Sequence, residues 1–257
     1  IIDSFPENQY LSYVAYQRGM LLKEEGREKE AVASFNIAKR EDAALFRAAQ
    51  SEIGRILAKT DPEAAIANYQ KIVESCETQE DSALAIIGIG DVYVTVQKWK
   101  EAAETFKKVY DFYRGSDTTL LAGALVKWVD ALNNSGDYLE AIKAADIMQK
   151  LLPDNEFTIN TVYFEAAALL ALKRYSEARS RFLEIIQLNR SEQLSEIAMY
   201  QKADCQYFSK SFAAAIREYD EYIKKYPKGK YRANALYMQG NAYWNGQDFT
   251  NARTKFQ

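Results

Sequence analysis

Small and aromatic residues recur along the chain at a nearly constant interval. An alanine is followed four positions later by an aromatic residue at Ala31/Phe35, Ala65/Tyr69, Ala102/Phe106, Ala178/Phe182, Ala215/Tyr219 and Ala252/Phe256. Ala141/Ala145 belongs to the same series but lacks the aromatic residue. Successive alanines of the series are 34, 37, 39, 37, 37 and 37 residues apart. This interval predicts an internal structural repeat.

The residues between these anchors favour helices. Apolar positions follow helical spacing, as in the segment 235–243, and turn-forming residues such as Gly26, Asp61-Pro62 and Ser135-Gly136 separate the segments. We therefore predict that each repeat consists of two amphipathic helices of roughly 12–15 residues. A single pair of helices cannot bury this much apolar surface, so the repeats are expected to stack on one another.

The pattern resembles the tetratricopeptide repeat family, whose motif places Gly or Ala and Tyr on a first helix and Ala and Phe on a second. The best-matching segments are Ile86 to Val109 and Leu236 to Phe256. The resemblance implies an all-α fold, a right-handed superhelical solenoid of antiparallel helix pairs with about seven repeats. Two repeats depart from the motif, because Ser51-Glu52-Ile53 and Val129 stand where a small residue of the first helix is expected.

The repeats predict a single solenoid over residues 1–257 that is truncated at both ends. Residues 2–10 read like residues 223–231, so we expect the chain to open within the end of a preceding repeat. The predicted units are that fragment at 1–11, full repeats at 12–45, 46–82, 83–121, 122–158, 159–195 and 196–232, and a partial repeat at 233–257.

Composition argues against several classes of catalytic site. The 257 residues include no histidine, which excludes Ser-His-Asp and Cys-His catalysis and histidine-ligated zinc. The chain also lacks a phosphate-binding G-x-x-x-x-G-K-[ST] loop and a G-x-S-x-G elbow. We therefore expect a protein that is not an enzyme, with no cofactor and no metal.

Charge and hydropathy limit the classes of partner that we expect for this chain. The net charge of -3 gives no general case for a nucleic-acid surface. The longest apolar run, Ala83 to Gly90, is far short of the ~18 residues that span a bilayer. The basic stretch Lys224 to Arg232 is expected to be a solvated loop, although it could contact an anionic partner. Cys76 and Cys205 fall in different repeats, so we expect no disulfide between them and a buried, apolar role for Cys205.

In tetratricopeptide arrays the first helix of each repeat lines a concave groove that holds an extended peptide or a partner helix. Aligning this sequence with that motif predicts a groove with a continuous aromatic strip beside short polar side chains. The expected partner-binding residues are Tyr163, Tyr200, Asp204, Tyr207, Tyr237, Asn241 and Trp244. Tyrosine and tryptophan combine a large contact area with a polar group, which suits them to interfaces.

We interpret the chain as a non-catalytic scaffold that binds a protein segment, with unknown oligomeric state. Asp91, Asp130 and Asp204 are expected to make the groove mildly acidic and to suit a neutral or basic ligand. The stretch 226–237 is similar to repeats of bacterial envelope proteins, which implies a periplasmic or outer-membrane-associated protein in envelope assembly, with a cytoplasmic location as the alternative. Two other functions remain open: a glycan-binding groove, and the regulatory arm of a longer enzyme.

Overall fold

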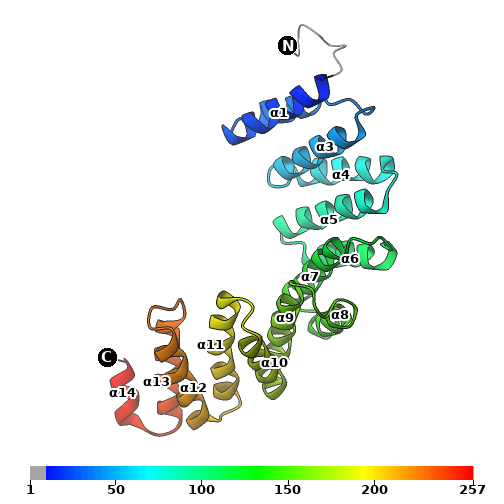
Figure 1. Cartoon of the computed structure of the whole chain (residues 1–257). Coiled ribbons are helices and arrows are strands. Elements are labelled where there is room, and N and C mark those ends of the chain that lie inside the picture. The colour runs from blue at the N-terminus through cyan, green and yellow to red at the C-terminus, as the bar shows by residue number, and fades with distance from the viewer. Residues whose placement is uncertain (1–9, 257) are drawn as a thin grey trace. The chain divides into compact units, whose positions relative to one another are not determined.

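The computed structural model describes residues 10–256, and within them every regular element is an α-helix (Figure 1). The fourteen helices described form seven consecutive pairs, which confirms the predicted all-α array of about seven repeats. The first seven are α1 (Leu11–Glu24), α2 (Glu28–Phe35), α3 (Ala43–Leu57), α4 (Pro62–Ser75), α5 (Gln79–Thr95), α6 (Trp99–Phe112) and α7 (Thr118–Ser135). The remaining seven are α8 (Tyr138–Leu151), α9 (Thr158–Ala171), α10 (Tyr175–Leu188), α11 (Glu192–Phe208), α12 (Phe212–Lys225), α13 (Arg232–Asn245) and α14 (Phe249–Phe256).

The chain divides into two compact units, Ile1–Ala131 and Leu132–Gln257, which we call unit 1 and unit 2. The boundary falls within α7. The fragment predicted at residues 1–11 lies almost wholly outside the described residues.

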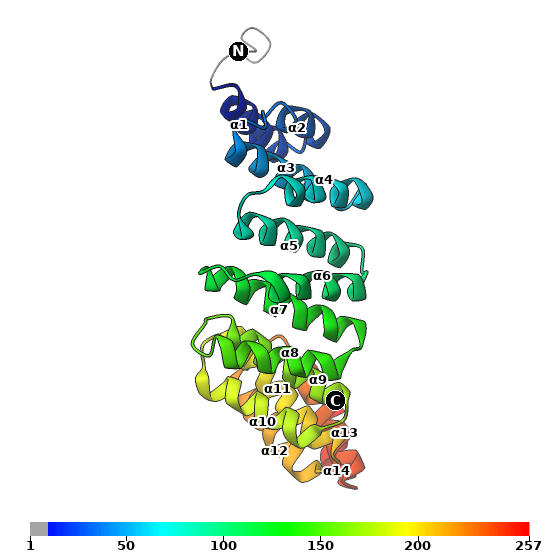
Figure 2. The same ribbon diagram turned by 90° about the vertical axis from the view of Figure 1, so that its right-hand side faces the viewer.

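Successive helices pack against one another from α1 to α6 in unit 1 and from α8 to α14 in unit 2, and α7 contacts α6 through the stacked rings of Trp128 and Tyr110. Odd-numbered helices also contact one another, as α1 with α3 and α3 with α5 in unit 1, and α9 with α11 and α11 with α13 in unit 2. Among the described residues, no two even-numbered helices make comparable contacts. The first helices of the repeats therefore form one side of each unit, which we call the inner face. Figure 2 shows the helices of unit 1 stacked in chain order.

The alanine and aromatic series forms the core between the paired helices. Every alanine of the series is fully buried, and the aromatic residues Phe35, Tyr69, Phe106, Phe182 and Tyr219 are at most 4% exposed. A glycine on the first helix makes room for the ring in several repeats: a Cβ atom added at Gly19 would clash with Phe35, and one at Gly90 would clash with Phe106. A small residue at this position is thus required by close packing of helix against ring.

One sequence prediction about this packing is wrong. The repeat of α3 and α4 does possess its small residue, because Gly54 lies against the ring of Tyr69. In most of the other repeats the small residue lies 12 positions before the alanine of the series, and the same count from Ala65 leads to Ile53, one residue before Gly54. A shift of one residue turns a side chain by about 100° around a helix. On the other side of the same ring lies Gly88 of α5. Tyr69 is therefore packed between two glycines.

The turns inside the repeats share one backbone conformation. Gly26, Gln97, Gly136, Lys173, Lys210 and Gln247 all have positive φ, between 58° and 86°. The amide of the next residue then bonds back to the helix, as Ser211 N to Gln206 O at 2.9 Å. This is the Schellman arrangement that ends a helix in a left-handed residue. The repeat of α3 and α4 instead uses Asp61, whose carboxylate accepts the Ala64 amide at 3.0 Å, with Pro62 opening the helix.

Both cysteines are free thiols, as the sequence predicts. Cys205 is 1% exposed and packs in the core of unit 2 with Phe182 and Ala198. Burial raises the pKa of its thiol to about 12. A thiol that resists ionisation is unreactive, so Cys205 acts as a small apolar core residue.

Candidate partner-binding face

The seven predicted binding residues lie on α9, α11 and α13, the first helices of three repeats in unit 2. Their exposure differs widely. Tyr237 and Trp244 are 60% and 59% exposed, whereas Asp204 is only 8% exposed. The other four are half-buried: Tyr163, Tyr200, Tyr207 and Asn241. Of the seven, Tyr237 and Trp244 are therefore the two whose side chains are largely exposed to solvent.

The predicted tyrosines pack on the second helix of their own repeat. Ring centroids lie 6.4 Å apart for Tyr163 and Phe182, 6.2 Å for Tyr200 and Tyr219, and 6.0 Å for Tyr237 and Phe256. In unit 1 the equivalent pair, Tyr16 and Phe35, is separated by 5.7 Å. Each partner lies 19 residues further along the chain. The ring surface that each tyrosine buries against its partner thus stabilises its own repeat. Among the described ring contacts, none joins Tyr200 to Tyr237 in a continuous strip.

Tyr200 and Asp204 belong to a polar cluster beneath the inner face. Tyr219 of α12 donates a hydrogen bond of 2.5 Å to Asp204 Oδ1, and the ring of Tyr200 stacks on Tyr231 at 5.2 Å and 9°. Burial raises the pKa of Asp204 to about 6, although hydrogen bonds from Tyr219 and Tyr200 oppose the shift. Asp204 therefore stabilises contacts between α11 and α12 and offers little of its carboxylate to a ligand.

The α13 residues form an open stripe on the inner face. Tyr237, Asn241 and Trp244 lie four and then three residues apart, which puts them on one side of the helix. Trp244 meets Phe249 edge to face with centroids 5.0 Å apart. Asn245 at the end of α13 donates a hydrogen bond of 3.0 Å to the hydroxyl of Tyr207 on α11. The predicted residues of α11 and α13 are thus brought together at this end of the stripe.

A pocket in unit 1 was missed by the sequence prediction. It has a volume of about 310 Å³ and lies between α3 and α5 on the inner face, over the ring of Tyr69. The walls combine apolar and polar side chains: Ser51, Arg55, Ala58, Leu84, Ile87, Asp91, Val92 and Thr95. Gly88 opens the pocket, because no side chain at that position covers the tyrosine. The sequence signal was Gly88, which lies two residues before Gly90 of the repeat motif on α5.

Of the three aspartates from which we predicted an acidic groove, Asp91 and Asp204 have partners within the fold. Asp204 is buried and hydrogen-bonded, and the carboxylate of Asp91 pairs with Lys127 Nζ at 2.5 Å. Arg55, which lines the pocket of unit 1, likewise pairs with Glu52. These two acidic side chains thus have basic or hydroxyl partners that lie elsewhere in the sequence.

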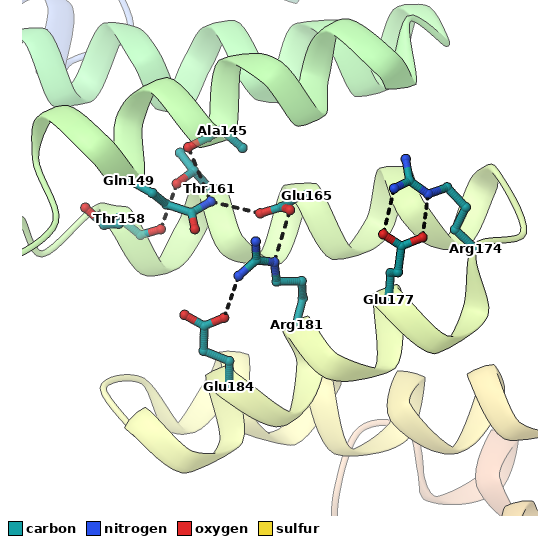
Figure 3. A network of polar contacts seen from close by, with 9 residues as sticks. All are labelled: Ala145, Gln149, Thr158, Thr161, Glu165, Arg174, Glu177, Arg181 and Glu184. Carbon is teal, nitrogen blue, oxygen red and sulfur yellow. Dashed lines mark hydrogen bonds and ion pairs between the residues drawn. The ribbon is translucent and has the colours of Figure 1, made fainter.

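Unit 2 also contains a buried acidic network, and this one is structural. Glu165 of α9 is 5% exposed and accepts hydrogen bonds from Gln149 Nε2 at 2.8 Å and Arg181 Nε at 3.0 Å (Figure 3). Arg181 continues to Glu184 at 2.9 Å. With both oxygens satisfied, Glu165 links α8, α9 and α10, and it has no unpaired oxygen to offer as a general base.

Two cavities lie away from the inner face. One, of about 290 Å³, borders the Glu165 network between α8, α9 and α10, and the other, of about 450 Å³, lies between α4, α5 and α6. In the part of the chain that the structure describes, no group of three or more potential ligands could hold a metal ion. No described helix is long and apolar enough to cross a membrane.

Comparison with known families agrees with this architecture. The model of a family described as tetratricopeptide repeat matches residues 163–230 and 212–257. Residues 163–257 thus belong to the tetratricopeptide repeat family. The matched residues cover the stripe on α13 and the cluster around Asp204. Proteins with such repeats are in general scaffolds for protein–protein interaction. No protein of curated function matches the chain significantly.

Solved structures show the same fold at low sequence identity. A tetratricopeptide repeat protein from Parabacteroides merdae is 14% identical, over 95% of this chain and 90% of that chain, with a TM-score of 0.62. The apo form of RapI is 13% identical, over 96% and 74%, with a TM-score of 0.71. For pilF of Pseudomonas aeruginosa the identity is 20%, over 84% and 90%, with a TM-score of 0.57. At such identities the likeness extends to the fold alone.

Proposed function

We propose that this tetratricopeptide repeat array is a non-catalytic scaffold that holds an extended peptide segment on its inner face. The observation that supports this most is the pocket over Tyr69 in unit 1. Its volume of about 310 Å³ exceeds what one amino-acid side chain requires, and it opens between first helices, where a peptide can reach it.

The pocket offers complementary groups for such a segment. Leu84, Ile87 and Val92 would bury an apolar side chain of the ligand, since removing apolar surface from water is favourable by about 25 cal/mol per Å². Thr95 and Ser51 provide hydrogen-bonding groups for the ligand backbone. Arg55 and the Asp91–Lys127 pair would select against ligands with mismatched charge.

In unit 2 the proposed contacts are the predicted residues of α9, α11 and α13. Tyr237 and Trp244 would supply most of the binding free energy, because exposed aromatic side chains lose little conformational entropy when they are covered. Tyr163, Tyr200 and Tyr207 would contribute through the edges that their packing leaves exposed. Asn241 would hydrogen-bond the ligand backbone.

The test is retention of partners from a lysate of the source organism, with identification by mass spectrometry. The bait is the chain beside two variants, Leu84→Arg in unit 1 and a double Tyr237→Ala, Trp244→Ala variant in unit 2. We expect a protein that is retained by the unmodified chain and lost with one or both variants.

A matched control variant is available. Leu139 on α8 is 61% exposed and Leu84 is 57% exposed, but Leu139 lies on a second helix. Leu139→Arg should leave retention unchanged. Equal retention by the unmodified chain and by both inner-face variants, with helicity intact, would contradict the proposal and favour the two cavities away from the inner face.

We also propose that the scaffold works in the bacterial cell envelope, in the periplasm or at the outer membrane. The support is the similarity of residues 226–237, with a Tyr-Pro turn, a second Tyr and Ala-Leu-Tyr, to repeats of envelope proteins. Fractionation of cells that express the natural gene product tests this. Recovery in the cytoplasmic fraction alone would overturn the location and leave the scaffold function untouched.

A further inference from the structure

The C-terminal repeats present a one-sided distribution of charge. Residues 222–247 include Lys224, Lys225, Lys228, Lys230 and Arg232 but no aspartate or glutamate. All five cationic side chains are exposed, and among the described residues none of them forms an ion pair. We propose that the inner face of unit 2 selects an acidic peptide, whose carboxylates lie over the turn between α12 and α13 and whose apolar side chains lie on Tyr237 and Trp244. This inference rests on the proposed scaffold function and names its ligand.

The basic turn is held in one conformation. Glu196 of α11 accepts the amide of Lys230 at 2.7 Å and the hydroxyl of Tyr222 at 2.8 Å. The same tyrosine hydroxyl accepts the amide of Tyr231 at 3.0 Å. Gly229 fits beneath these groups, since a Cβ atom there would overlap Glu196 and Tyr222. A preorganised turn loses little entropy on binding, so its charges are available at low cost.

The acidic residues around the turn already have partners within the fold. Glu196 is used by the turn itself. Asp220 accepts Gln239 Nε2 at 2.6 Å, and Glu221 pairs with Lys202 at 3.3 Å. These carboxylates therefore stabilise α11, α12 and α13, and they do not pair with the five cations. The remaining positive charge faces solvent and is complementary to an anionic ligand.

The helix that follows the turn strengthens this preference. Arg232 begins α13, and the amino end of a helix has a positive partial charge that attracts carboxylates. From that end the exposed residues Asn234, Tyr237 and Trp244 follow along one side of the helix. A ligand lying along α13 thus meets positive charge first and aromatic surface afterwards. The helix has 14 residues, or about 21 Å, which an extended peptide of about six residues would span.

A peptide fits these features better than a nucleic acid. Stacking of successive bases requires a run of open aromatic faces, but of the rings on α13 and in the turn before it only Tyr237 and Trp244 are largely exposed, at 60% and 59%. Lys225 and Lys230 lie over the rings of Tyr226 and Tyr231, at 5.3 and 5.5 Å, which also covers those rings. Carboxylates require only the exposed ammonium groups and amide edges, all of which remain accessible.

The experiment selects ligands from a random peptide library displayed on phage, with peptides about twice as long as the predicted contact. The baits are the unmodified chain, a Lys228→Glu, Lys230→Glu, Arg232→Glu variant, and a control variant with the same change in charge. The control, Lys71→Glu, Lys98→Glu, Lys100→Glu, alters exposed lysines of unit 1. Circular dichroism establishes that all three proteins keep their helicity.

We expect peptides selected by the unmodified chain and by the control variant to be rich in Asp and Glu and to include an aromatic or large apolar residue. The three-site variant should lose them, with affinity for a selected peptide reduced about tenfold or more, and raised salt should weaken binding to the unmodified chain. Tyr237→Ala, Trp244→Ala should also weaken it.

The outcomes separate this inference from the function on which it rests. Enrichment of neutral or basic peptides would overturn the proposal of an acidic ligand but not the scaffold function. Acidic peptides that still bind the three-site variant would have the same consequence. No enrichment, together with no partner from the lysate, would overturn both. Capture of nucleic acid by the unmodified chain but not by the three-site variant would replace the peptide with a different ligand class.

Discussion

The hydroxyl of Tyr219 lies 2.5 Å from Oδ1 of Asp204, inside the contact between α11 and α12. Asp204 is 8% exposed, and burial raises its pKa from the ordinary value of 3.8 to about 6, even though the hydrogen bonds from Tyr219 and Tyr200 favour the charged form. The folded state therefore binds a proton at Asp204 more tightly than the unfolded state does.

Because of this difference, the contribution of Asp204 to stability decreases as pH rises. The contribution of Asp204 to the free energy of unfolding is fully present below its unfolded pKa of 3.8 and is lost as pH rises through about 6. The full shift corresponds to ~3 kcal/mol at most. We expect Asp204→Asn to remove this decrease in stability between about pH 4 and about pH 7.5.

Thermal unfolding of the chain and of Asp204→Asn across that range is the measurement. Asp154→Asn serves as the control, because Asp154 is exposed in the turn before α9. Other carboxyl groups titrate in every variant, so the quantity of interest is the difference between variants. A parallel pH dependence of the chain and Asp204→Asn would show that Asp204 does not titrate in this way.

Replacing either of two arginines of α10 by methionine should change the stability of the chain to different degrees. Arg181 pairs with buried Glu165 at 3.0 Å, whereas Arg174 pairs with exposed Glu177 at 2.6 Å (Figure 3). Arg181→Met leaves the Glu165 carboxylate with Gln149 alone, and we expect a loss of ~2 kcal/mol in the free energy of unfolding. Arg174→Met should have no measurable effect. Denaturant unfolding of both variants checks this, and equal losses would contradict the distinction by burial.

The repeat packing predicts a contrast between two helical glycines of unit 1. A Cβ atom at Gly90 of α5 would overlap the ring of Phe106, whereas one at Gly123 of α7 would have no neighbour within 4 Å. Gly90→Ala should destabilise the chain by ~2 kcal/mol, because neither the buried ring nor the helix can move aside without strain. Gly123→Ala should leave stability unchanged or raise it by up to about 1 kcal/mol. Chemical denaturation of the two variants tests the contrast, and its reversal would mean that the first helix does not approach the ring so closely.

The fold could be predicted because the same short sequence pattern occurs many times along the chain. One alanine four residues before a phenylalanine means little, but six such pairs at nearly constant spacing leave only stacked helix pairs. The repeat packs as predicted, with Ala178, Phe182, Ala215 and Tyr219 fully buried. Register within a repeat was less certain. At Gly54 the spacing differs from the neighbouring repeats by one residue, and counting from Ala65 selected the wrong side of α3.

The candidate site was predicted only in part, because the spacing of residues does not give their depth. Asp204 and Asn241 hold equivalent places in the repeat, yet Asp204 is buried since a tyrosine stands at position 219 and donates to it. The corresponding position after Asn241 is Phe256, which has no hydroxyl group. The pocket over Tyr69 depends on two glycines, Gly54 and Gly88, from separate helices. Such combinations require knowledge of which side chains meet.

The turns within the repeats offer a last prediction, since one backbone conformation is occupied by different residues. Lys210 has φ 64° and Gly136 has φ 86°, at equivalent positions two repeats apart. A side chain in the left-handed region costs roughly 1–2 kcal/mol, and glycine avoids this cost but loses more conformational entropy on folding. Lys210→Gly should therefore stabilise the chain by up to about 1 kcal/mol, and Gly136→Ala should destabilise it by about 1 kcal/mol.

Neither substitution alters packing in a way that would hide this effect. A Cβ atom at Gly136 has no neighbour within 4 Å, and Lys210 is exposed. Lys224→Gly, at an exposed position in the last turn of α12, is the control and should be destabilising, because glycine is unfavourable within a helix. Equilibrium unfolding in denaturant gives all three values. If Lys210→Gly were destabilising to the same degree as Lys224→Gly, the turn at 210 would not hold the left-handed conformation that ends α11.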